Sequence, residues 1–148
     1  FREICKQNPE VSLLTNSAAN NGNPFGAADY RMNRDKLLDT GLTLYEYEGG
    51  GSYHGKSIVM GEELSAVGSF NMDMRSVYLD TEMMLVIDSR EVTAQLKEYL
   101  TAYEEESVKV LPDGTREIPE GVTPQELTGK RKIQVFLVGL FDWLRFLM

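Results

Sequence analysis

The sequence contains a single histidine, and the residues around it have types and spacings that suit phosphate chemistry. His54 and Lys56 lie two positions apart in a segment expected to be a strand, so both side chains point to the same face. Ser69 and Asn71 repeat this spacing just beyond the next expected strand. A hairpin between the two pairs would bring all four side chains to one edge of a sheet. Such a group can bind a phosphate, because lysine supplies charge, serine and asparagine donate hydrogen bonds, and imidazole acts as nucleophile or acid.

Glu82 stands at the start of the following expected strand and can orient the imidazole through its second ring nitrogen. From the pattern alone, however, a lone histidine in a strand is more often a structural residue than a catalyst. The residues by themselves therefore leave both interpretations of His54 open.

The helices and strands that must position these residues are predicted from hydrophobic periodicity and from the Gly, Pro and Asn residues that mark turns and loops. Expected helices cover residues 1–8, 27–40 and 90–107, and expected strands cover 11–15, 42–48, 56–60, 64–68 and 82–88. Residues 16–26 and 69–80 are expected to be loops. This alternation predicts an α/β fold with a mixed central sheet flanked by helices.

The C-terminal part of the sequence is different in character. Residues 110–127 are rich in Pro, Gly and charge, which predicts an irregular arm, and the sixteen residues from Ile133 are almost all apolar. A helix of that length spans about 24 Å, short of a hydrocarbon core of about 30 Å. Trp143 and the basic residues 130–132 favour an amphipathic helix lying on an anionic membrane. The alternative is a helix that packs on the sheet or on another domain. The expected domains are residues 1–107 and 108–148.

Composition sets broad limits on the function. The net charge of -8 argues against a nucleic-acid partner. The single cysteine, Cys5, excludes an internal disulfide and favours a reducing compartment. No cofactor or metal motif is present, so none is expected. The chain begins without methionine, which indicates a fragment of a longer protein.

The stretch HGKSIVMGEELSAVGSFN resembles the signature of the phospholipase D superfamily, which reads H-x-K, four residues, D, six residues and G-S-x-N. The matching positions are His54, Lys56, Gly68, Ser69 and Asn71. Glu82 falls where the family carries a downstream glutamate. Across residues 11–89 the chain resembles the C-terminal half of bacterial cardiolipin synthases, through LLTNS, LLDTGLTLYEYEGG, VGSFNMDMRS and TEMMLVIDS.

The resemblance implies a metal-free phosphatidyltransferase of phospholipid biosynthesis that works through a phosphohistidine. Two motif copies face each other in this family, and His54, in a C-terminal copy, would be the general acid and base. Lys56, Ser69, Asn71 and Glu82 would complete its catalytic half, with Arg75 and Ser76 as further phosphate-binding residues. The other half would come from the same chain or from a dimer. The implied substrate is a phospholipid such as phosphatidylglycerol, at the cytoplasmic side of a bacterial cell membrane.

One position departs from the signature, because Gly61 stands where the family has aspartate. Either Glu62 compensates through a bulge, or the site works without this carboxylate, or this copy is impaired. The alternatives to a phosphatidyltransferase are a phosphodiesterase or nuclease of the same superfamily, and a weakened half that serves as a dimer or membrane interface. The isolated chain is expected to have little or no phosphatidyltransferase activity.

Two further groups of residues have open interpretations. Arg31 and Arg34, one turn apart on an expected helix, are expected on a solvated face. A set of methionines either lines a path for acyl chains or packs in a core or interface. These are Met72, Met74, Met83 and Met84.

Overall fold

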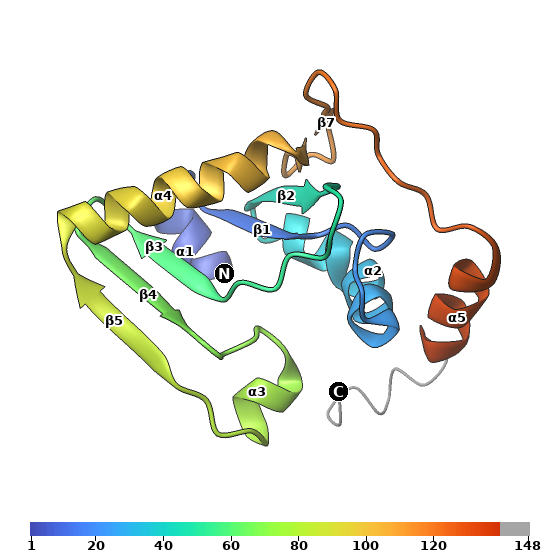
Figure 1. Ribbon diagram of the computed structural model, residues 1–148, viewed down its shortest axis with the longest axis horizontal. Coiled ribbons are helices and arrows are strands. Elements are labelled where there is room, and N and C mark those ends of the chain that lie inside the picture. The colour runs from blue at the N-terminus through green and yellow to red at the C-terminus, as the bar shows by residue number, and fades with distance from the viewer. Residues whose placement is uncertain (140–148) are drawn as a thin grey trace. The chain divides into compact units, whose positions relative to one another are not determined.

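The computed structural model describes residues 1–139, and its helices and strands are labelled in Figure 1. Residues Asp142, Trp143 and Arg145, which the sequence placed on the C-terminal helix, lie outside the described part. The chain divides into two compact units. The first comprises Phe1–Tyr53 and the described residues from Tyr103 onward, and the second is His54–Ala102.

The first unit is built on a four-stranded sheet. Its strands are β1 (Ser12–Asn16), β2 (Thr43–Tyr47), β6 (Ser107–Val110) and β7 (Arg116–Glu117), in the order β1-β2-β6-β7. β1 and β2 pair in parallel, whereas β6 pairs antiparallel with both of its neighbours. A parallel pair needs a crossover connection, which α2 (Pro24–Leu38) supplies.

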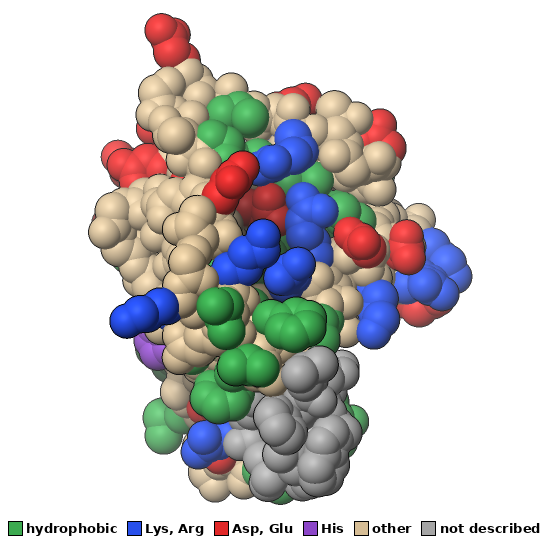
Figure 2. Space-filling model, turned by 90° about the vertical axis from the view of Figure 1, so that its right-hand side faces the viewer, with side chains coloured by type: hydrophobic (Ala, Val, Ile, Leu, Met, Phe, Trp, Pro, Cys, Tyr) green, Lys and Arg blue, Asp and Glu red, His purple; other side chains and the backbone are tan. Residues whose placement is uncertain are grey.

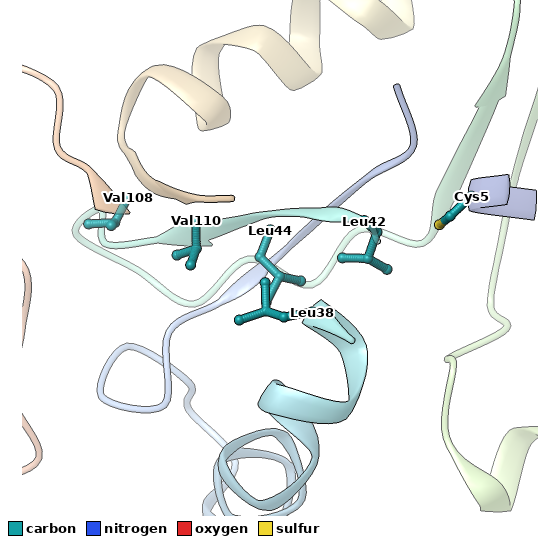
Figure 3. Packing of buried hydrophobic residues seen from close by; sticks show 6 residues of the cluster. All are labelled: Cys5, Leu38, Leu42, Leu44, Val108 and Val110. Carbon is teal, nitrogen blue, oxygen red and sulfur yellow. The ribbon is translucent and has the colours of Figure 1, made fainter. Parts of the chain in front are cut away.

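The core of this unit lies between the sheet and two helices, α1 (Arg2–Gln7) and α2. Figure 3 shows Leu38 of α2 directed at Leu44 of β2, which is opposite Val110 of β6 in the register. The buried cluster is Cys5, Leu38, Leu42, Leu44, Val108 and Val110. Because strands β2 and β6 both contribute fully buried side chains, they form the centre of this unit.

α2 begins three residues earlier than expected. Asn23 caps it by accepting a hydrogen bond from the Phe25 amide, and Pro24 occupies the first turn, where its missing N–H costs nothing. The helix ends at Leu38, and Gly41 follows with a φ of 95°. The expected loop at 16–26 therefore ends sooner, because the Asn-Pro pair is a helix start and not only a turn signal.

α5 (Gly129–Gly139) packs on α2 around Val135, and Val138 is partly buried against the same cluster. Val135 is buried against Ala27 and Ala28, whose small side chains let the two helices approach closely. No helix among residues 1–139 is both long enough and apolar enough to cross a bilayer.

The second unit contains a three-stranded antiparallel sheet. Its strands are β3 (Ser57–Met60), β4 (Leu64–Gly68) and β5 (Met84–Asp88). Helix α3 (Met74–Tyr78) lies in the connection from β4 to β5. α4 (Arg90–Glu105) follows β5 and passes into the first unit at its last residues. The chain thus has the expected α/β fold with a mixed sheet and flanking helices, and its strands are distributed over two sheets.

Three elements, β6, β7 and α3, were not expected from the sequence, and β7 has two residues within the expected irregular arm. β6 is only four residues long and follows a long helical pattern, so its apolar residues were assigned to the helix end and the irregular arm. α3 has five residues within the expected loop 69–80, where Asp73 caps it by accepting a hydrogen bond from the Ser76 amide.

Candidate functional site

His54 and Lys56 lie side by side just before β3. β3 begins at Ser57, so His54 is not on the strand. The carbonyl of Lys56 accepts a hydrogen bond of 3.0 Å from the Gly68 amide, which extends the β3–β4 ladder by one residue. The Nζ of Lys56 lies 2.9 Å from Nε2 of His54 and 3.0 Å from the His54 carbonyl oxygen. The expected strand start at residue 56 was thus one residue early, yet the two side chains meet. His54 is exposed to solvent.

Glu82 accepts hydrogen bonds from two serine hydroxyl groups. Ser69 Oγ donates to Glu82 Oε2, and Ser76 Oγ donates to Oε1 over 2.6 Å. The backbone amide of Asn71 donates to Ser76 Oγ over 3.3 Å. The sequence suggested that Glu82 orients the imidazole, but in this structure both carboxylate oxygens are engaged by serines. Four of the expected site residues are therefore joined in one network.

Glu82 and Lys56 have shifted pKa values. The hydrogen bonds from Ser69 and then Ser76 hold the pKa of Glu82 below its usual value of 4.5, and the charges of Lys56 and Arg75 add to this effect. Burial lowers the pKa of Lys56, while the charges of Glu82 and Asp73 oppose that shift. Glu82 is thus held as a carboxylate, which keeps both serine hydroxyl groups in fixed positions.

Gly68 allows strands β4 and β5 to approach each other closely beside the hydrogen bonds of Glu82. A Cβ at this position would lie well inside van der Waals contact of the Met83 carbonyl oxygen and 2.8 Å from Met84 Cα. The Ser69 amide donates to that same carbonyl over 3.0 Å, and the Met83 amide donates to Ser69 Oγ over 3.1 Å. The glycine of the signature is therefore needed for close backbone approach, which brings Ser69 to Glu82.

Gly61 occupies the three-residue turn between β3 and β4, at the opposite end of the hairpin from Lys56. Its φ of 63° is left-handed, a conformation in which glycine has no steric cost. Glu62 and Glu63 pair with Lys97 and Arg90 of α4, the first over 2.5 Å. Compensation by Glu62 is therefore not observed, because its carboxylate is bound at α4.

Arg75 and Ser76 lie on α3 and have different environments. Ser76 is buried, whereas Arg75 is exposed and pairs with Asp80 over 2.8 Å, so that it braces the loop after α3. Met72 and Met83 are also exposed, at 58% and 79%, and do not pack in the core of this unit. Only Ser76 of the two additional phosphate-binding candidates joins the network around Glu82.

Asp73 was not among the site residues expected from the sequence. Its carboxylate caps α3, and this fixes Ser76 against Glu82. Asp is a preferred residue at a helix N-cap, but the five-residue helix that it starts is too short to be seen from periodicity.

Comparison with known proteins assigns the chain to a family. A family model described as "Cardiolipin synthase, PLD-like domain" matches residues 1–103, which include all of the residues discussed above around His54 and Glu82. The chain belongs to this family.

Several bacterial proteins share part of this sequence. Cardiolipin synthase A of Wigglesworthia glossinidia brevipalpis is 43% identical over 68 residues, which are 46% of this chain and 14% of that protein. Cardiolipin synthase A of Cronobacter sakazakii is 44% identical over 68 residues, with the same two shares. Cardiolipin synthase A of Yersinia pseudotuberculosis is 41% identical over 81 residues, 55% of this chain and 16% of that protein. The chain thus covers about one seventh of the length of these relatives.

Proposed function

We propose that this chain is the C-terminal half of the catalytic part of a cardiolipin synthase-like phosphatidyltransferase. The observation that carries the proposal is the pairing of His54 with Lys56, next to a glutamate that holds two serine hydroxyl groups. The family and the names of the relatives support the same assignment. One histidine supplies one half of a two-histidine reaction, so a second motif copy, in the same chain or in a partner, completes the site.

In the proposed reaction, the histidine of the other copy attacks the phosphorus of a phosphatidyl donor such as phosphatidylglycerol. A phosphorus–nitrogen bond forms, and the bond to the leaving glycerol oxygen breaks. His54 gives its proton to that oxygen and then takes the proton of the acceptor hydroxyl, which attacks phosphorus and releases the first histidine. Lys56 and Asn71 bind the non-bridging oxygens and stabilise the charge that develops on them.

Glu82 acts in this proposal through Ser69 and Ser76. Its carboxylate fixes both hydroxyl groups, and the Asn71 amide bonded to Ser76 is fixed with them. Ser69, Ser76 and Glu82 are therefore positioning residues, and Arg75 reaches the phosphate only if it leaves Asp80. The reaction is placed at a bacterial cell membrane, with the site on the cytoplasmic side.

The experiment is a transfer assay on phosphatidylglycerol vesicles with the full-length protein that contains these residues, beside its His54→Ala variant. We expect cardiolipin from the unaltered protein and a loss of at least 1,000-fold in the variant, since it removes the general acid and base together with its hydrogen bonds. A matched control is Lys97→Gln, which removes an exposed cation of the same unit and should leave the rate unchanged. An unchanged rate in His54→Ala would refute the proposal.

A weakened half with an interface role is the second candidate. It is supported by Gly61, where no carboxylate stands, and by Glu62, which is bound at α4. The same assay distinguishes it: no product from the full-length protein, with vesicle binding retained, would favour this candidate. Phosphatidic acid in place of cardiolipin would favour a phospholipase D-type hydrolase.

A further inference from the structure

The first unit contains an open pocket of about 520 Å³, built from other residues than those around His54. Its walls come from the segment after β1, from α2 and β2, and from the C-terminal arm with α5. The charged residues that line it are Arg31, Arg34, Glu46, Glu48, Arg116, Glu126 and Lys132. Figure 2, which views the side of the molecule that carries α5, shows Lys and Arg side chains gathered around recessed acidic groups.

The carboxylate of Glu46 at this pocket is fully engaged. Its Oε1 accepts hydrogen bonds from Tyr30 Oη over 2.6 Å and from Arg34 Nε over 2.5 Å. The side chain of Glu46 is 8% exposed and that of Arg34 is 26% exposed. Burial, and then the charge of Glu46, raise the pKa of Tyr30, so its hydroxyl stays a donor. Arg34 is therefore not on a solvated face as expected, because its charge is bound to a buried carboxylate.

The second buried carboxylate, Glu48, is held by neutral groups. Its Oε2 accepts from Ser17 Oγ over 2.9 Å and from the Gln125 amide over 3.2 Å. Burial raises the pKa of Glu48. The charge of Arg116 also acts to lower the pKa of Glu48, against the larger effect of burial. Neither buried carboxylate, however, forms an ion pair with Arg31, Arg116 or Lys132.

Those three cations have no ion-pair partner among residues 1–139. Lys132 also lies in the first turn of α5, with Lys130 and Arg131 and without an acidic residue. Cations are unfavourable at this end of a helix, because the helix dipole is positive there. The pocket is lined by four cations and three carboxylates, a positive excess of one in a chain of net charge -8. Its three cations without an ion pair in the described part of the chain suit an anionic ligand.

An apolar face of α5 adjoins the pocket. Ile133, Phe136 and Leu137 are 61%, 60% and 50% exposed, while Val135 turns toward α2. Phe136 is four residues after Lys132, so the two side chains share one face of the helix. A small anion would use the cations alone, but a phospholipid also brings acyl chains that cover exposed apolar side chains.

We propose that this pocket binds the phosphate of an anionic phospholipid headgroup, with the exposed face of α5 resting in the membrane interface. Arg31 and Arg116 bind the phosphate oxygens through their planar guanidinium groups, and Lys132 adds a third charge. The apolar side chains of α5 enter the boundary between headgroups and acyl chains. This site holds the chain on the membrane and requires no chemistry at His54.

The test is co-sedimentation of the 148-residue chain with vesicles of phosphatidylcholine, with and without one third phosphatidylglycerol. We expect binding only to the anionic vesicles. The double variant Arg31→Gln/Arg116→Gln should lower the partition coefficient about 25-fold, because each cation at an anionic surface contributes about fivefold. The matched control Arg2→Gln/Lys6→Gln removes two exposed cations from α1, outside the pocket, and should change it by less than about twofold.

Two further measurements separate the sources of the phosphate. Phe136→Gln should weaken vesicle binding equally at low salt and at 0.5 M salt, because it removes an apolar contact. The effect of Arg31→Gln/Arg116→Gln should disappear at 0.5 M salt, because charges are screened. Inorganic phosphate should compete only weakly with the vesicles, and Phe136→Gln should leave the molecular mass measured by ultracentrifugation unchanged. Equal loss in both double variants would overturn the proposal. It would equally fail if inorganic phosphate bound at the pocket without vesicle binding, or if the apolar face formed a dimer. Because the readout is binding, its failure leaves the transfer assay unaffected.

Discussion

Replacement of Gly68 by alanine tests whether close strand approach builds the network around Glu82. The new Cβ would lie 2.8 Å from Met84 Cα and even closer to the Met83 carbonyl oxygen, both of which are backbone atoms. The strands must therefore move by at least about 0.6 Å, the difference from an ordinary contact of about 3.4 Å. That movement acts on the two hydrogen bonds between Ser69 and Met83 and on the ladder bond from Gly68 to Lys56.

Each of these hydrogen bonds contributes about 1 kcal/mol, so we expect Gly68→Ala to lower the free energy of unfolding by about 2 to 3 kcal/mol. Urea unfolding followed by circular dichroism measures this loss. Amide hydrogen exchange of Met83 reports the local effect, because its N–H is bonded to Ser69 Oγ. Protection of that amide should fall more in Gly68→Ala than protection of amides in the first unit.

The matched control is Gly61→Ala, at the other end of the same hairpin. Its Cβ would meet open space, so only the left-handed φ of 63° opposes it, at a cost of about 1 kcal/mol. If Gly68→Ala is as stable as Gly61→Ala and keeps the Met83 amide protected, the reasoning about strand approach is refuted.

Two other substitutions follow from the hydrogen bonds of the carboxylates. Ser76→Ala removes a donor to Glu82, so the pKa of Glu82 should rise toward 4.5, as measured by nuclear magnetic resonance titration; an unchanged pKa would contradict the assigned bond. The pKa of Glu82 is depressed in the folded chain, so the stabilisation from Glu82 is fully present above about pH 4.5 and is lost as the pH falls through the folded pKa. Ser76→Ala should reduce this loss of stability at acid pH. Glu46→Gln should lower the free energy of unfolding by about 2 kcal/mol in urea, because it leaves the charge of Arg34 without its partner. As a control, Glu117→Gln breaks an exposed pair with Lys109 and should lower the free energy of unfolding much less. Equal losses in Glu46→Gln and Glu117→Gln would contradict the role of burial.

The site was predictable where local spacing determines it. His54 and Lys56 lie two positions apart in sequence, and a tight hairpin between β3 and β4 returns the chain from Gly61 to Gly68 beside Lys56. The partners of Glu82 were not predictable in the same way. Which group meets its carboxylate depends on the register between β4 and β5 and on the cap of α3, and both are set by contacts across the fold.

The fold shows the same division. Periodicity indicated the longer helices and most strands, because those segments repeat an apolar pattern over enough residues. β6 gave no such signal, since its four residues follow directly on a long helical pattern, yet it pairs with β2 in the middle of the first sheet. Its position depends on a pairing between residues that are about sixty positions apart.

The sequence by itself determined which kinds of residue stand along one hairpin and at what spacing, because these are local properties of the chain. Only the tertiary structure decided which charges are neutralised. Arg31 and Arg34 are one turn apart on α2 and look equivalent in the sequence. Arg34 faces the buried Glu46 of β2, whereas Arg31 remains at the open pocket without an ion-pair partner among residues 1–139. The difference arises from what packs against each face of the helix, and sequence spacing does not contain that information.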